Sequence, residues 1–383
     1  MPRPLQPLGA QMPWMPRSEA RFRVKISSSD SLFPSFLPQE VEKIEDPFVR
    51  TLAKRIERIP VPVKIGISNE VIMSSCVRPK AVGKYGTPVV LLHSFDSSCL
   101  EWRCAYPLLE SAGLDAWAVD VLGWGFSDLE SRPPCDVESK RRHLYKLWET
   151  YIEKPMILVG PSLGASVAID FTAHYPEAVE KLILINPSVY AEGTGNLAHL
   201  PKTLAYAGVS LLRSKPLRLY ANYLAFNNIP FHTIWDWTNV GRLHCLLPWW
   251  KDATVSFMSS GGYNVKSYIK QITHKTLIIS SEQDKIVSYQ VSVKLHSELP
   301  NALIRKVSDS GHLPHVDNPD AVAKLIADFV HRQEQVRVHV QAPRLQQVRD
   351  HVQTPRLALG AMKPILVARK RKDKVSRQSD IHI

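Results

Sequence analysis

The chain has 383 residues, five cysteines and a net charge of +12. The charge lies at the two ends, because residues 1–29 carry a net charge of +4 and residues 331–383 a net charge of +8. Residues 30–330 are therefore neutral, so the net charge is no argument for nucleic-acid binding and we expect no nucleic-acid partner. The cysteines form no Cys-x-x-Cys pair, so we expect reduced thiols, no disulfide framework, no bound metal and no cofactor.

The first 36 residues have the composition of an organelle-targeting segment. Residues 1–36 contain six prolines, several arginines and serines, and few acidic residues. Such a composition resembles that of a transit peptide, although an ordinary disordered extension has similar features. The sequence also lacks the run of about 18–20 apolar residues that is needed to cross a bilayer. We therefore expect a protein that is soluble or peripheral on a membrane.

From Pro60 on, short apolar runs alternate with segments of helical periodicity. The expected strands are residues 61–67, 71–77, 88–93, 116–121, 156–159, 179–185, 276–280 and 302–307. The expected helices are residues 100–111, 163–175, 291–299 and 319–331, and one that begins after Asp136 as its N-cap. This alternation predicts an α/β fold, with a mostly parallel sheet covered by helices on both faces. Ligands of such sheets bind at the carboxyl ends of the strands.

Residues 190–264 interrupt the alternation between two strands of the core. The core is thus predicted in two parts, residues 37–189 and 265–332, with residues 190–264 inserted as a cap over the site. The cap holds four of the nine tryptophans. We expect Trp235, Trp237 and Trp249 to line an apolar substrate cleft, although apolar residues of a cap also pack against one another.

The C-terminal residues 333–383 contain a near duplication, QVRVHVQAPRL followed by QVRDHVQTPRL, and end in a basic run. Two copies at a period of 12 residues are too few to build a repeat fold. We expect a disordered tail whose basic run is a weak patch for a membrane surface or an acidic partner.

The sequence Gly160-Pro161-Ser162-Leu163-Gly164 follows the apolar run MILV and precedes an expected helix. A nucleophile elbow needs a strand, a tight turn and a helix in this order, with glycines two positions from the serine. Ser162 is therefore the predicted nucleophile of a serine hydrolase.

A serine hydroxyl needs a base, and in folds with this elbow the acid and the histidine follow the serine along the chain. Asp284 comes after the strand TLIIS, and His312 follows the last strand, so we expect Asp284 and His312 to complete a catalytic triad. Glu282 and His315 are the nearest alternatives. A metal site at His312 and His315 lacks a third ligand and is not favoured.

The oxyanion hole is expected from the backbone N–H groups of Leu163 and Phe95, the latter in the loop after the strand PVVLLH. That loop usually begins with His-Gly, whereas this chain has His93-Ser94. If the second position requires a positive φ, serine costs about 1 kcal/mol or more there and misaligns the hole.

Several longer motifs carry a family resemblance. In the core they are LLHSFDSSCLEWR, DVLGWGFSD and GPSLGASVAIDF, and in the cap YAEGTGNL, DWTNVGRLHC and PWWKDATVSFMSSGGYNV, with the lead-in LPQEVEKIEDP. Over residues 37–330 the chain resembles α/β-hydrolases related to bacterial carbon–carbon bond hydrolases. It is also similar to a plant plastid branch of that group linked to tocopherol (vitamin E) synthesis. The resemblance implies a plastid address and esterase-like activity on a prenyl-bearing substrate, for which a chlorophyll-related phytyl ester is one candidate.

Three classes of function remain open at this point, because one triad geometry serves many reactions. The first is hydrolysis of a large apolar carboxylic ester. The second is carbon–carbon bond hydrolysis or acyl transfer, and the third is a ligand-binding protein with a silent triad. A serine at the elbow, where epoxide hydrolases and haloalkane dehalogenases have an aspartate, argues against those two classes.

Overall fold

An eight-stranded sheet forms the centre of the computed structural model, which describes residues 33–65, 68–80, 86–227 and 229–340. The strands are β1 Glu57–Ile65, β2 Ser68–Val77, β3 Val89–Leu91, β4 Ala116–Val119, β5 Met156–Pro161, β6 Val179–Ile185, β7 Lys275–Ser281 and β8 Ala302–Val307. Their order across the sheet is β1-β2-β4-β3-β5-β6-β7-β8. β1 and β2 pair antiparallel, as do β2 and β4, and all other pairs are parallel. The predicted fold class, a mostly parallel sheet with flanking helices, is confirmed.

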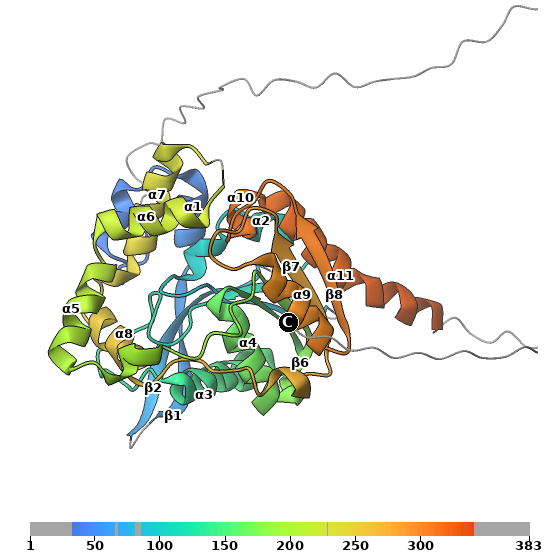
Figure 1. The fold of residues 1–383 in the computed structure, drawn as a ribbon, viewed down its shortest axis with the longest axis horizontal. Helices are drawn as coiled ribbons and strands as arrows, with labels where there is room; N and C mark the ends of the chain where they lie inside the picture. The colour runs from blue at the N-terminus through green and yellow to red at the C-terminus, as the bar shows by residue number, and fades with distance from the viewer. Residues whose placement is uncertain (1–32, 66–67, 81–85, 228, 341–383) are drawn as a thin grey trace, which may run out of the picture. The chain divides into compact units, whose positions relative to one another are not determined.

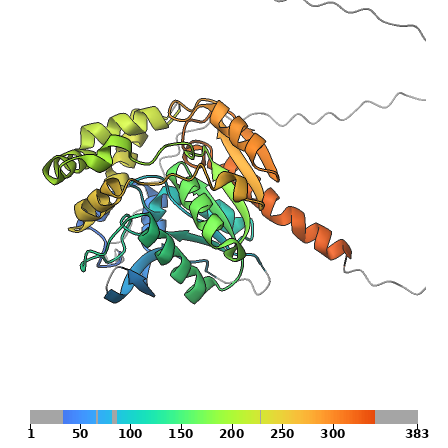
Figure 2. The ribbon, with the colours of Figure 1, turned by 60° about the horizontal axis from the view of Figure 1, so that its bottom comes forward.

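Helices cover both faces of the sheet (Figures 1 and 2). The helices of the core are α1 Pro47–Ala53, α2 Tyr106–Ser111, α3 Val137–Leu147, α4 Leu163–His174, α9 Tyr289–Glu298, α10 Pro314–Asp317 and α11 Pro319–Val340. Successive residues of β5 point to opposite faces, so Leu158 joins the core beneath α3 and α4, while Ile157 and Val159 join the core beneath α2 and α11. A strand that is buried on both faces has the continuous apolar sequence from which it was predicted.

One expected helix is divided in two. Residues 100–111 form a short 3-10 helix, Cys99–Trp102, followed by α2, in which Pro107 stands in the first turn. Proline is tolerated there, because the first N–H groups of a helix have no partner within the helix. α3 begins after Asp136 as expected, and the Asp136 carboxylate accepts a hydrogen bond from the Ser139 N–H at 2.7 Å.

The inserted segment between β6 and β7 is helical. It contains α5 Lys202–Leu212, α6 Lys215–Ala225, α7 Phe231–Arg242 and α8 Trp250–Ser259, with the short 3-10 helix His244–Leu246 between the last two. Figure 2 shows these yellow-green helices gathered on one side of the sheet. We call residues 190–264 the cap.

The ends of the folded part differ from the expected boundaries. Phe33 is buried, and Arg50 lies 4.9 Å from the centre of its ring, so packing begins before the expected boundary at residue 36. α11 continues to Val340, past the expected boundary at residue 332. The remaining parts of the predicted transit segment and basic tail lie outside the described residues. Within the described ranges, no helix has the length and apolar character needed to span a membrane.

Candidate active site

Ser162 occupies a sharp turn between β5 and α4, with φ 50° and ψ −116°. This region of backbone conformation is strained for a residue with a Cβ, and it is typical of a nucleophile elbow. The flanking glycines are required by close approach. A Cβ on Gly160 would lie 2.2 Å from the Gly164 carbonyl oxygen, and a Cβ on Gly164 would lie 2.8 Å from the His93 carbonyl oxygen. The loop after β3 therefore packs directly against the turn that carries Ser162.

The structure brings Ser162, His312 and Asp284 together. Ser162 Oγ lies 2.8 Å from His312 Nε2, and His312 Nδ1 lies 2.8 Å from Asp284 Oδ2. The Asp284 and His312 side chains are only 3% and 6% exposed. Asp284 Oδ1 accepts hydrogen bonds from the N–H groups of Ile286 and Val287, so both carboxylate oxygens have partners. This arrangement favours the tautomer with the proton on Nδ1, leaving Nε2 as an acceptor for the serine hydroxyl.

Glu282 and His315, the alternatives to Asp284 and His312, have other partners. Glu282 is exposed and pairs with Lys306 at 2.8 Å. His315 is buried and lies 3.0 Å from Glu101. Among the described residues, His312 and neither of these two side chains hydrogen-bonds to Ser162, so the geometry favours Asp284 and His312.

Asn186, at the carboxyl end of β6, holds in place the loop between β8 and α10. This loop carries His312, and we call it the histidine loop. Its Nδ2 donates to the carbonyl oxygens of Gly311 and His312 at 3.1 and 2.8 Å, and its Oδ1 accepts from the Ser281 N–H. Asn186 has a φ of 41°, a conformation that asparagine tolerates better than most residues. Asn186 was not among the site residues predicted from the sequence, although an asparagine directly after a buried strand at the ligand-binding edge was a usable signal.

The two predicted oxyanion donors follow the elbow and β3. Leu163 is the first residue of α4, directly after Ser162, and Phe95 lies in the loop that packs against the elbow. In the described part of the chain, no acceptor is recorded for either N–H group. Free N–H groups at this edge are able to bind developing negative charge.

Ser94 does not have the strained, positive-φ backbone considered from the sequence. Asp96, and not Ser94, has the positive φ in this loop, at 48°. Ser94 Oγ donates to Glu101 Oε2 at 2.5 Å, and the Ser94 N–H lies 3.2 Å from both Glu101 oxygens. The serine is therefore an integral part of the loop, held by a buried carboxylate.

We call the loop after β3, which carries Ser94 and Phe95, the oxyanion loop. Glu101 connects it to the histidine loop, because Glu101 also accepts a hydrogen bond from His315, three residues after His312. Burial raises the pKa of Glu101, but hydrogen bonds and charge from His315, with smaller contributions from His93 and Ser94, outweigh it and lower this pKa to about 2. Glu101 is therefore ionised at neutral pH.

Asp96 joins the same loop to the cap. Its carboxylate forms an ion pair with Arg218 of α6 and accepts hydrogen bonds from His244 at 3.0 Å and Trp250 at 2.7 Å. Burial alone would raise the pKa of Asp96, but Arg218, His244 and Trp250 hold it below its ordinary value. Asp96, which directly follows Phe95, is thus a buried carboxylate that is ionised, as Glu101 is.

Asp96, His244 and Cys245 are the group of described residues with donor atoms close enough to hold a metal ion. Arg218 already places positive charge among them, because its Nη2 contacts the Asp96 carboxylate and lies 2.9 Å from Cys245 Sγ. Burial also keeps the pKa of the Cys245 thiol well above its ordinary value, which disfavours the thiolate that metals bind. We therefore interpret the cluster as an ion-pair network.

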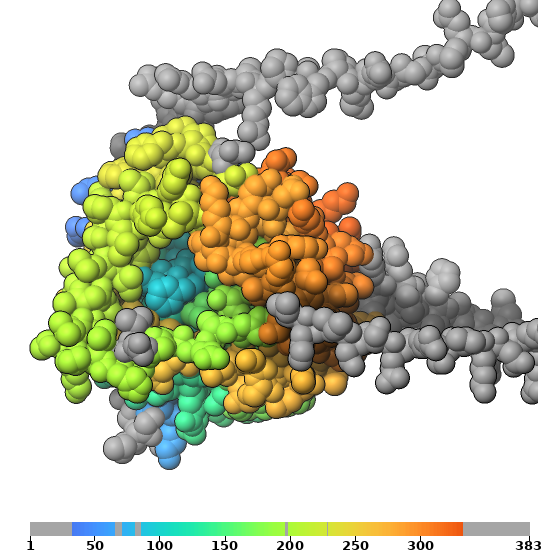
Figure 3. Space-filling view, in the orientation of Figure 1, coloured from blue at the N-terminus to red at the C-terminus, as the bar shows by residue number. Residues whose placement is uncertain are grey.

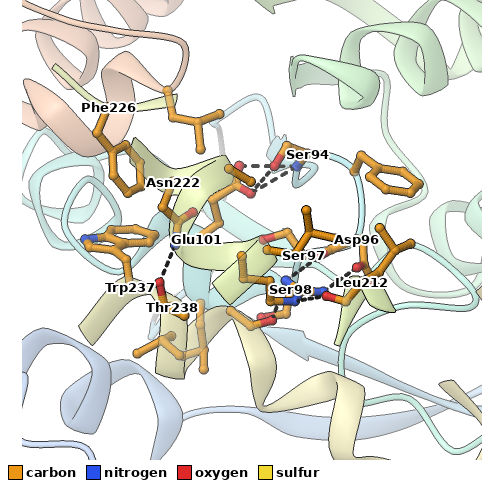
Figure 4. A pocket seen from close by; sticks show the side chains of 18 residues that line it. Ser94, Asp96, Ser97, Ser98, Glu101, Leu212, Asn222, Phe226, Trp237 and Thr238 are labelled. Atoms are coloured by element: carbon orange, nitrogen blue, oxygen red, sulfur yellow. Dashed lines mark hydrogen bonds and ion pairs between the residues drawn. The ribbon is translucent and has the colours of Figure 1, made fainter. Parts of the chain in front are cut away.

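A cavity of about 190 Å³ lies between the oxyanion loop and the cap (Figure 4). Its lining includes Phe95, Leu313, Phe226 and Trp237, together with polar side chains such as Asn222. Figure 4 shows Phe226 and Trp237 side by side, and their rings contact edge to face at 5.4 Å. None of the three candidate triad residues lines this cavity, but Phe95, whose N–H is a predicted oxyanion donor, and Leu313, which directly follows His312, do.

Only one of the three predicted substrate-binding tryptophans lines this cavity. Trp237 does, whereas Trp235 is 39% exposed and lies under the Lys215 ammonium group. Trp249 lines a separate cavity beside Arg132. In the space-filling view, blue-green atoms of the segment near the oxyanion loop are visible in a hollow between the yellow-green cap and the orange C-terminal elements (Figure 3).

Comparisons with known proteins identify relatives over most of the chain. The family model described as "Alpha/beta hydrolase family" matches residues 89–325. The Arabidopsis thaliana "Alpha/beta hydrolase domain-containing protein VTE7" is 62% identical over 314 residues, which are 82% of this chain and 95% of that protein. An Escherichia coli "2-hydroxy-6-oxononadienedioate/2-hydroxy-6-oxononatrienedioate hydrolase" is 25% identical and matches 65% of this chain and 89% of its own length.

Solved structures share the fold at low sequence identity. A thermophilic esterase from Thermogutta terrifontis superposes with a TM-score of 0.59 at 17% identity, over 74% of this chain and 98% of its own. A meta-cleavage product hydrolase from Pseudomonas fluorescens IP01 gives a TM-score of 0.56, also at 17% identity, over 72% and 97%. These likenesses concern the fold alone.

Proposed function

Because the chain belongs to the α/β hydrolase family, we propose that it is a serine hydrolase that cleaves a large apolar carboxylic ester. The observation that carries the proposal is the pair of 2.8 Å contacts that link Ser162 through His312 to Asp284. A serine held in this way can be deprotonated as it attacks, which a solvated serine cannot.

In the proposed reaction, Ser162 Oγ attacks the ester carbonyl carbon while His312 Nε2 takes the hydroxyl proton. The N–H groups of Leu163 and Phe95 bind the oxyanion of the tetrahedral intermediate. His312 then gives the proton to the departing alcohol, which leaves an acyl group on Ser162. Water, deprotonated by His312, attacks this acyl-enzyme. The bond between the acyl carbon and Ser162 Oγ then breaks, His312 returns the proton to Ser162 Oγ, and the carboxylic acid is released. Asp284 keeps the imidazole oriented and stabilises its charged form throughout.

The lining of the cavity supports an apolar substrate. The cavity between the oxyanion loop and the cap presents Phe226, Trp237 and Leu313, and each buried methylene of a substrate contributes about 0.8 kcal/mol to binding. At about 190 Å³ the cavity is smaller than the roughly 300–1,000 Å³ of pockets that enclose drug-sized ligands. A prenyl or long alkyl chain would therefore be enclosed in part, with its remainder outside the cavity.

The charges in the cavity favour an ester over an acidic substrate. A carbon–carbon bond hydrolase that acts on a dienol acid needs a cation for the substrate carboxylate. Among the described residues that line the cavity, Arg218 is the cation, and its charge is already neutralised by Asp96. We therefore rank ester hydrolysis above carbon–carbon bond hydrolysis and acyl transfer.

The proposed setting is the plastid, with a phytyl ester related to chlorophyll as the proposed natural substrate, supplying tocopherol synthesis. Support comes from the transit-like composition of residues 1–36, from the motifs shared with the plastid branch, and from the 62% identity to a plant protein. A fluorescent protein fused behind residues 1–36 should enter plastids. If it stays outside, this part of the proposal is wrong.

The decisive experiment is covalent labelling with a fluorophosphonate probe, which reacts with activated serines. Labelling should be lost in Ser162→Ala and retained in Ser166→Ala, a control one turn along the same helix whose hydroxyl donates to the Ser188 carbonyl. Turnover of esters should fall by several orders of magnitude in Ser162→Ala alone. Labelling that persists in Ser162→Ala would move the nucleophile to another serine, and an unlabelled wild-type protein would support the silent-triad alternative.

A further inference from the structure

We propose that the outer face of the cap binds the surface of an anionic lipid bilayer. This outer cap face consists of exposed apolar side chains on three successive helices: Leu204 and Leu211 of α5, Tyr220 and Tyr223 of α6, and Phe231 and Trp235 of α7. In Figure 3 the yellow-green surface of these helices is continuous along one side of the cap.

α5 is apolar on two sides. Ala205 and Val209 are buried on its inner side, which contacts α8. On its outer side Leu204 and Leu211, seven residues apart and thus on the same side of the helix, are 56% and 63% exposed. A helix of a water-soluble surface usually has polar residues opposite its packed side. The outer side of α5 therefore fits an apolar phase better than water.

The aromatic residues of α6 and α7 extend this face. Tyr220, Tyr223 and Phe231 are 60%, 61% and 67% exposed. Folded monomers rarely leave large apolar side chains together in water unless the patch has a partner. Tyrosine and tryptophan, with an apolar ring and a polar tip, are enriched where hydrocarbon meets lipid headgroups. The composition of the face thus matches the interfacial layer of a bilayer.

The charge of this segment selects an anionic surface. The sequence holds no aspartate or glutamate between Glu192 and Asp236, while Lys202 and Arg213 are exposed at the two ends of α5. A lysine or arginine near an anionic membrane surface strengthens binding about fivefold. Two copies of the face placed against each other would instead bring like charges together, which disfavours a dimer through this surface.

The position of the face also suits a substrate that arrives from a bilayer. Leu217 of α6 is 41% exposed and lines the cavity that Phe95 and Leu313 also line, and Tyr220 of the outer cap face stands three residues later on the same side of α6. A chain too long for the cavity could keep its remainder in the bilayer. This last link rests on the proposed ester hydrolysis, whereas membrane binding itself does not, so Ser162→Ala should bind vesicles as the wild-type protein does.

Co-sedimentation of the full chain with phosphatidylcholine vesicles, with and without phosphatidylglycerol, tests the proposal. The wild-type protein should bind, and more strongly with phosphatidylglycerol. The combined variant Leu204→Ser, Leu211→Ser, Tyr220→Ser and Phe231→Ser should lose at least about tenfold in partition coefficient, because it removes four apolar anchors. The variant Lys202→Gln with Arg213→Gln should lose about 25-fold on phosphatidylglycerol vesicles only.

Matched controls distinguish binding through the outer cap face from binding through apolar or basic residues elsewhere. All variants retain the basic chain ends, so the contribution of these ends to binding is the same in each. Phe48→Ser with Val293→Ser, both exposed outside the cap, and Lys64→Gln with Lys270→Gln should bind as the wild type does. Hydrolysis of a short soluble ester by the four-residue variant should be unchanged, which shows that it folds. Unchanged vesicle binding by both cap variants overturns the proposal. If the four-residue variant also dissociates a dimer in sedimentation velocity, the face belongs to a contact between copies.

Discussion

Arg218 of the cap and Asp96 of the loop after β3 form a buried ion pair across 122 positions of the sequence. Asp96 follows Phe95, whose N–H is the proposed oxyanion donor, and Arg218 also donates to the Gly241 carbonyl oxygen at 3.0 Å. The cap is therefore bonded to the loop that would stabilise the transition state. An insertion that serves only as a cover would not need such a bond.

Removing the cation of this pair should be strongly destabilising. Arg218→Met leaves the Asp96 carboxylate buried with only neutral donors, and breaking a buried pair in this way costs about 3–5 kcal/mol. Urea denaturation measures the loss, and the double variant with Asp96→Asn should recover part of it. Kinetics on a short ester should show a fall in kcat larger than the change in KM. Stability within about 0.5 kcal/mol of the wild type would show that the pair is not the link inferred here.

Ser94→Gly should fail to raise turnover, contrary to what the sequence pattern suggested. The backbone at Ser94 is not in the positive-φ region, and its hydroxyl donates to the ionised Glu101. A hydrogen bond to a charged group contributes about 1.5–3 kcal/mol, so the loss of stability should be of this size. Ser94→Ala, which removes the hydroxyl without loosening the backbone, is the matched variant. A higher kcat in Ser94→Gly but not in Ser94→Ala would restore the idea of a strained loop.

The two histidines of the last loop should behave differently when replaced. His312→Ala should reduce kcat by several orders of magnitude with little loss of stability, because it removes the proposed base. His315→Ala should mainly reduce the free energy of unfolding, because it leaves Glu101 buried with one partner fewer. His315→Gln, which keeps a donor for Glu101, should recover much of that stability. Turnover per folded molecule that falls equally in both alanine variants would contradict these separate roles.

Asp317 should make stability depend on pH. Burial raises its pKa to about 6, against the hydrogen bonds from the Gly311 and Asn227 N–H groups, which lower it. Its unfolded pKa is about 3.9, so the folded state binds more protons between these values and stability falls as pH rises from about 4 to 6. The difference is at most about 3 kcal/mol, since one pKa unit corresponds to about 1.4 kcal/mol.

The Asp317→Asn variant isolates this effect. Relative to the wild type, it should gain stability as pH rises from 4 to 7, as measured by urea denaturation at each pH. His143, whose pKa burial lowers to about 4, changes stability in the opposite direction over this window. Because both proteins retain His143, its contribution cancels in the difference. A difference that does not change with pH would show that Asp317 titrates at its ordinary pKa.

Trp237, among the three tryptophans first considered, should control the preference for chain length. We expect kcat/KM to rise over the first several methylenes of the ester and then to level off, because the cavity encloses only part of a long chain. Trp237→Leu should weaken this rise, whereas Trp235→Leu and Trp249→Leu should leave it unchanged with soluble esters. A profile that is flat in the wild type would remove the case for an apolar substrate.

Local sequence was sufficient to predict the elbow and the sheet. Ser162 stands between a buried strand and a helix that follow it in the chain, and each is recognisable from its own apolar pattern. The same reasoning predicted that Asp284 and His312 would come together, because both follow parallel strands whose carboxyl ends lie at one edge of the sheet. The geometry of the candidate triad therefore depends on short segments and on the strand order of the fold.

Only the tertiary structure determined which side chains connect these segments. Glu101 and His315 are 214 residues apart, and Asp96 and Arg218 are 122 apart, so no local pattern marks them as partners. Which tryptophan meets the cavity was equally undecided, because residues 235 and 237 lie two positions apart on α7 and so face different sides of the helix. Periodicity determines that a helix has an apolar side, but only the packing of distant elements determines which side faces the cavity, the core or the solvent.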